Sequence, residues 1–210
     1  MSITDSQRLA FAGALAANLE GLLELHAIVA ERRAKLVESE EILRTAVERV
    51  AAEESRASGA LGALGEASEG AVKKARLIGL KLETAALEGA IPEALYRETL
   101  ARLFPRGPQS LGQTPRERVE AMRVAHMTLE GSEADPSGEL AALAQAAVDA
   151  IESANASAKQ NAVGKEEAAA SLVMARASFD RGYRATKEIL SGLLRDAERL
   201  AELSDIFPDL

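Results

Sequence analysis

Residues 15–50 read LAANLEGLLELHAIVAERRAKLVESEEILRTAVERV, and an aliphatic residue returns at every seventh position of this stretch. The sevenfold positions are Leu15, Leu22, Val29, Leu36, Leu43 and Val50. A repeat of seven keeps one seam of a helix facing a partner helix. The surrounding residues 5–57 contain no proline and only two glycines, Gly13 and Gly21. We therefore expect one long helix over 5–57.

Residues 58–65, with the sequence SGALGALG, predict a turn that reverses the chain, because three close glycines permit the positive backbone angles of a reversal. Beyond this turn, the helical pattern carries two apolar stripes. One stripe contains Val72, Ala75, Gly79, Leu82 and Ala86, and the other contains Leu77, Leu80, Leu87 and Ile91. A helix that is apolar on two faces needs cover on both, which predicts a central position in a bundle or contact with a second subunit.

Residues 66–130 as a whole predict a broken helical segment. Pro92 interrupts it, because proline lacks an amide donor and collides with the preceding turn. Loop 105–114 interrupts it a second time. Thr114 and Glu117 then form a capping-box pattern, which predicts that a new helix begins there.

Residues 138–203 predict the last long helix, followed by a short tail over 204–210. A reversal near residues 161–164 is the alternative, but this stretch lacks a dense cluster of turn formers, so we favour one helix. Together the segments predict an all-α fold with a single domain over 1–210. We expect an elongated antiparallel helical bundle or coiled coil with three long layers, the middle one broken at Pro92 and at loop 105–114.

The composition supports helices and limits the chemistry. Aromatic residues make up only 3% of the chain, whereas the strong helix formers Ala, Leu, Glu and Arg are abundant. The net charge of −8 disfavours binding to nucleic acid or to an anionic membrane. The absence of cysteine excludes disulfides, thiolate catalysis and zinc–thiolate sites. The chain starts without the basic stretch of a secretory signal, so we expect a cytoplasmic location.

The candidate catalytic and metal-binding residues are few. His26 and His126 are the only histidines, and neither has a glutamate three residues before it, the spacing that helical di-iron sites use. We interpret both as partly buried structural residues. His126 and Glu130 lie one turn apart but lack a converging third ligand. We therefore predict no metal, no cofactor and no catalytic residues.

The candidate partner-binding residues are apolar side chains that a single bundle could leave uncovered. They are Leu36, Leu43, Leu77, Leu80, Leu87, Ile206 and Phe207. Ile206 and Phe207 stand between aspartates in the tail, a composition suited to docking in a hydrophobic groove, and the alternative is a tail that folds back on its own bundle.

These observations favour a non-enzymatic helical scaffold, adaptor or assembly protein that acts through protein–protein contacts and self-associates. One alternative is a membrane-associated, crescent-type helical bundle, to which three long helices have an architectural likeness, although the net charge opposes it. A third is an enzyme with a site between helices.

Overall fold

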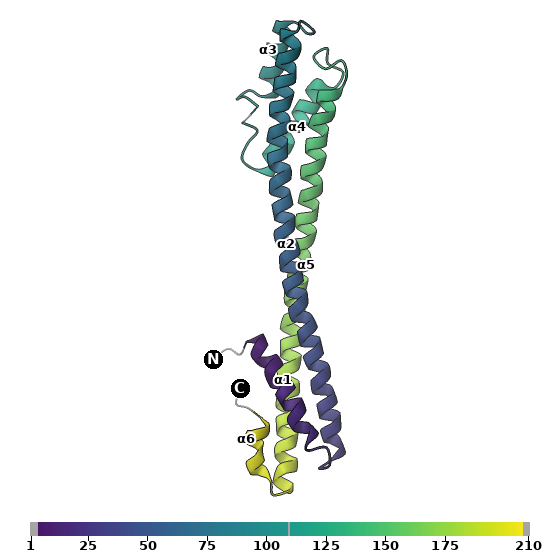
Figure 1. Cartoon of the computed structure of the whole chain (residues 1–210), viewed down its shortest axis with the longest axis vertical. Helices are drawn as coiled ribbons and strands as arrows, with labels where there is room; N and C mark the ends of the chain where they lie inside the picture. Colours follow the sequence, from purple (N-terminus) through teal and green to yellow (C-terminus); the bar gives the residue numbers. More distant parts are fainter. Residues whose placement is uncertain (1–3, 109, 208–210) are drawn as a thin grey trace. The chain divides into compact units, whose positions relative to one another are not determined.

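The computed structural model describes residues 4–108 and 110–207 and confirms the all-α prediction: the described residues form helices packed on helices and contain no strand (Figure 1). The elements are α1 (Asp5–Glu20), α2 (Ala27–Leu87), α3 (Glu93–Leu103), α4 (Pro115–Leu129), α5 (Glu139–Asp196), the 3₁₀ turn η1 (Leu200–Glu202) and α6 (Leu203–Ile206). Two of them, α2 and α5, are far longer than the rest.

The described residues divide into two compact units, each with its own hydrophobic core. Unit 1 takes its residues from Met1–Ser55 and Val163–Leu210, and unit 2 from Arg56–Ala162. Helices α2 and α5 therefore contribute residues to both units.

In unit 1, the chain reverses between α1 and α2, so the prediction of an unbroken helix over 5–57 was wrong. The Leu22 amide donates to the Leu19 carbonyl at 3.1 Å, and the Leu25 amide donates to the Leu22 carbonyl at 3.0 Å. The Nδ1 atom of His26 accepts a hydrogen bond from the Ile28 amide at 3.1 Å and so caps the start of α2. Leu22 is buried in the turn. The sevenfold repeat runs through this reversal because Leu22 occupies a core position in the turn itself.

The core of unit 1 therefore draws the sevenfold residues from two helices. All of them up to Leu43 are buried, and they share one core with Phe179, Tyr183 and Leu190 of α5. The sevenfold register places Leu36 and Leu43 on the seam that faces another helix, and both side chains are buried there. The periodicity located the core correctly, although it did not reveal that α1 and α2 are separate helices.

Two charge pairs join α1 to α5. The Arg8 guanidinium donates to both carboxylate oxygens of Asp180, at 2.9 and 3.1 Å. The Arg176 guanidinium donates to Asp5, with 2.6 Å between Nε and Oδ1. This hydrogen bond, reinforced by the positive charges of Arg176 and Arg8, holds the pKa of the Asp5 carboxyl below its ordinary value. Each of the two arginines binds its carboxylate through two hydrogen bonds, which is the geometry that arginine and carboxylate favour.

Residues 58–65 lie inside α2, so the predicted turn was wrong. Gly59, Gly62 and Gly65 are exposed, and a Cβ atom at any of them would meet nothing within 4 Å. Leu64, between them, packs against the core of unit 2. A helical glycine costs about 1 kcal/mol relative to alanine. Because helix elongation is cooperative, the helix on both sides and the partial burial of Leu64 outweigh the cost of the three glycines.

The predicted layout of three long layers was therefore wrong as well. In unit 2, α2 continues to Leu87, where Gly89 with a φ of +74° ends it, and Pro92 is the N-cap of α3. The short helices α3 and α4 pack with α2 and α5 around a core that includes Ile78, Met122 and Ile151. The predicted break at Pro92 is confirmed.

Helix α5 is continuous through residues 161–164, which confirms one helix over the alternative of a reversal. It ends at Asp196, earlier than the predicted residue 203. The Glu198 backbone adopts a positive φ of 58° just beyond this end, and η1 and α6 follow.

Candidate functional site

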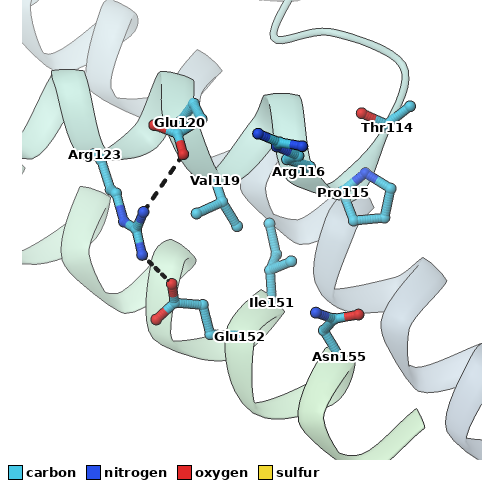
Figure 2. Close-up of a pocket in the computed structure, with 9 residues that line it drawn as sticks. All are labelled: Thr114, Pro115, Arg116, Val119, Glu120, Arg123, Ile151, Glu152 and Asn155. Atoms are coloured by element: carbon cyan, nitrogen blue, oxygen red, sulfur yellow. Dashed lines mark hydrogen bonds and ion pairs between the residues drawn. The ribbon is translucent and has the colours of Figure 1, made fainter. Parts of the chain in front are cut away.

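A pocket of about 390 Å³ lies in unit 2, between the start of α4 and the first third of α5 (Figure 2). Val119 of α4 and Ile151 of α5 contribute apolar surface to it. The Arg123 guanidinium pairs with Glu152 across the two helices and reaches Glu120 at 3.5 Å (Figure 2). The carboxylates of Glu120 and Glu152 are therefore both engaged in ion pairs with Arg123. The Arg123–Glu152 pair links α4 to α5.

The start of α4, at the edge of this pocket, is closed by the predicted capping box. The Glu117 amide donates to the Thr114 hydroxyl at 3.2 Å, and the Glu117 carboxylate accepts from the amides of Thr114 and Gln113, at 3.0 and 2.8 Å. These backbone hydrogen bonds lower the pKa of Glu117. The side chains of the capping box thus satisfy donors that could otherwise hold an anion.

The two histidines lie in different units and have structural contacts. His26 is exposed and caps α2, so the prediction of partial burial was wrong for it. His126 is partly buried, as predicted, and its Nδ1 atom lies 3.2 Å from the Ala141 carbonyl oxygen. Its Nε2 atom lies 3.8 Å from Glu130.

Within residues 4–108 and 110–207, no three His, Cys, Asp or Glu side chains gather in a way that could hold a metal ion. In the same part of the chain, no helix combines the length and the hydropathy that crossing a bilayer requires.

The predicted partner-binding residues fall into two classes. Leu36, Leu43, Ile206 and Phe207 are buried in the core of unit 1, so in this fold they offer no surface to a partner. Leu77, Leu80 and Leu87 are exposed on α2 in unit 2. We call these three residues the leucine stripe, because spacings of three and seven place them on one side of the helix.

The described part of the tail, up to residue 207, packs back on α1 and α5, which was the alternative interpretation of Ile206 and Phe207. The rings of Phe207 and Tyr183 meet edge to face, with 5.5 Å between their centroids. The Asn18 side-chain amide donates to the Ile206 carbonyl at 3.2 Å. The docking groove for Phe207 is therefore supplied by the chain's own helices.

The structure contains a second apolar surface, which the sequence pattern did not predict. In unit 1, a groove of about 640 Å³ lies between α2 and α5. We call it the α2–α5 groove; it is lined from α2 by Ile42, Thr45 and Ala46 and from α5 by Ser171, Met174 and Ser178, with charged residues at its ends. Ile42 and Met174 are exposed although both are apolar. The sevenfold repeat was the pattern in the sequence that indicated contact surfaces between helices. Neither Ile42 nor Met174 belongs to that repeat.

Comparisons of this chain with known protein families, with curated proteins and with solved structures give no match.

Proposed function

We propose that this protein is a non-enzymatic helical scaffold, adaptor or assembly protein, which binds other proteins and further copies of itself through its helical faces. The leucine stripe carries this proposal. Leu77, Leu80 and Leu87 stand on the solvent side of α2, while the opposite apolar stripe of the same helix is buried in the core of unit 2. Large apolar side chains that the chain leaves exposed on one side of a helix are typical of a surface that binds a partner.

The side chains around the stripe indicate the chemistry of this partner. Lys73 and Arg76 are exposed about one turn before Leu77 and Leu80. The best complement is an amphipathic helix with an apolar seam and an acidic residue at the end that lies over these two cations. The net charge of −8 favours a protein helix over an anionic lipid surface as the occupant.

The test is affinity purification of the full chain from the organism that encodes it, with identification of the bound proteins. The variant carries Leu80→Gln and Leu87→Gln. The matched control is Leu61→Gln, because Leu61 lies on the same helix and is 63% exposed, against 58% for Leu80. Each candidate partner is then purified, and its affinity for the three chains is measured by calorimetry.

We expect a partner that binds the wild type and the Leu61→Gln control equally, and the stripe variant at least about tenfold more weakly, as for the loss of central apolar contacts. Two outcomes would overturn the proposal. One is that no protein binds in a way that depends on the stripe. The other is that vesicles of phosphatidylcholine and phosphatidylserine bind the wild type but not the stripe variant. The leucine stripe would then be a membrane-binding surface and not a protein-binding one.

A further inference from the structure

The α2–α5 groove of unit 1 lies apart from the contacts that α1 makes. Helix α1 contacts α2 through Arg33, whose Nε atom donates to the Ala16 carbonyl at 3.0 Å, and contacts α5 through Arg176 and Asp180. None of these residues lines the groove. No residue of α1 lines the groove, and Ile42 and Met174 are exposed on it.

The charges on α2 show a symmetry about the middle of this groove. Glu41 lies four residues before Thr45 and Arg49 lies four residues after it, so all three share one side of the helix, and all three line the groove. A second α2 placed antiparallel across Thr45 would bring its Arg49 over the first Glu41, and its Glu41 over the first Arg49. The α2 side of the groove is thus electrostatically complementary to itself.

Helix α5 repeats this symmetry with a spacing of seven. Glu167 lies seven residues before Met174 and Arg181 lies seven after it, and all three are exposed. At one end of the groove, Arg49 of α2 lies 3.9 Å from Glu167 of α5, so the two helices present opposite charges at the same level. An antiparallel copy of α5 across Met174 would again place Glu167 over Arg181 in both directions.

We propose that a second copy of this chain occupies the α2–α5 groove, related to the first by a two-fold axis that is perpendicular to the helices and passes near Thr45 and Met174. Each α2 then faces the partner copy's α2, each α5 faces the partner copy's α5, and the four segments form an antiparallel bundle. An isologous contact requires a surface that is complementary to itself, and both helices meet this requirement. The inference rests on the self-association in the proposed function and names its surface.

The apolar and charged groups have different roles in this dimer. Burial of Ile42 and Met174 supplies affinity, because both are apolar and exposed in the single chain. Ala46 and Ser178 are small and let the facing helices approach closely. The ion pairs between the two copies contribute little affinity, because they lie at the exposed edges of the contact. The same charges disfavour a parallel arrangement, because each helix would then place its charges beside like charges of its copy.

The first experiment measures the dissociation constant of the full chain by sedimentation velocity over a concentration series. The variant is Met174→Glu, which would place a carboxylate in the centre of the contact. The control is Val173→Glu, because Val173 is the adjacent residue, is 60% exposed against 73% for Met174, and does not line the groove. We expect the variant to weaken dimerisation at least about tenfold and the control to leave it unchanged. Far-ultraviolet circular dichroism verifies that both variants remain helical.

The second experiment uses the absence of cysteine in this chain. In the Thr45→Cys variant, the two new thiols lie near the two-fold axis, so a short bis-maleimide should link the two chains. A Val37→Cys control places an exposed thiol of the same helix outside the groove and should give no linked dimer.

The outcomes separate this inference from the proposed function. A wild type that sediments as a monomer up to its solubility limit overturns the inference, while partner binding through the leucine stripe remains testable on its own. A dimer that is insensitive to Met174→Glu and is not linked through position 45 also overturns it, because self-association then uses another surface. Weakening by Met174→Glu alone, together with linkage at position 45, supports it.

Discussion

Shortening Leu43 to alanine tests whether the sevenfold residues hold unit 1 together. The Leu43 side chain is 0% exposed and shares a core with Phe179 and Tyr183. Leu43→Ala removes three carbon atoms, which at about 0.8 kcal/mol each amounts to a loss of about 2.4 kcal/mol in transfer free energy. The space left behind adds to this loss. We therefore expect a decrease of about 3 kcal/mol in the free energy of unfolding, within the 2–5 kcal/mol that is usual for buried leucines.

The assay is urea unfolding followed by far-ultraviolet circular dichroism at one fixed protein concentration, so that self-association affects all chains equally. Hydrogen exchange then locates the loss, which we expect in α1, the first half of α2 and the second half of α5. The control is Val37→Ala, an exposed site on the same helix, with an expected change below about 0.5 kcal/mol.

Equal effects of Leu43→Ala and Val37→Ala would refute the reasoning. The sevenfold residues would then be exposed in the free protein, and we would interpret them as a surface that binds a partner helix.

Three further predictions concern charge, backbone and metal. Because Arg176 lowers the pKa of Asp5, the stability from this pair is present above the ordinary aspartate value of about 3.9 and is lost as the pH falls through the lowered pKa. Asp5→Asn should therefore unfold more easily than the wild type near neutral pH, and a difference that persists in urea titrations at strongly acidic pH would contradict the assignment. Gly62→Ala should stabilise the protein by about 0.5–1 kcal/mol in urea unfolding, because residue 62 is helical and the added Cβ meets no atom within 4 Å; destabilisation would indicate a turn instead. Elemental analysis after dialysis against a chelator should find no stoichiometric transition metal, because imidazole is available only from His26 and His126 and the chain contains no thiol; one retained zinc or iron per chain would overturn the non-enzymatic proposal.

The features that the sequence determined are those with a local physical cause. Helical class follows from the abundance of strong helix formers and from the sevenfold repeat, and the start of α4 follows from Thr114 and Glu117, which bond to each other within one turn. The continuity of α5 follows from the lack of turn formers near residue 161. Burial of Leu36 and Leu43 follows from their register, which is the same whichever helix covers them.

Tertiary packing decided where the chain turns and which apolar faces stay open. The sequence signal of three glycines predicted a reversal at residues 58–65, but packing of Leu64 keeps α2 helical there, and the reversal falls at residues 21–26, where buried Leu22 anchors it. At these two locations the rest of the fold covers the apolar side chains differently. The helix propensity of a short segment carries no information about that cover. The α2–α5 groove is a property of the fold for the same reason. Ile42 and Met174 meet on one surface only because two helices distant in sequence lie side by side, and each alone is one of the scattered apolar residues found on any protein surface.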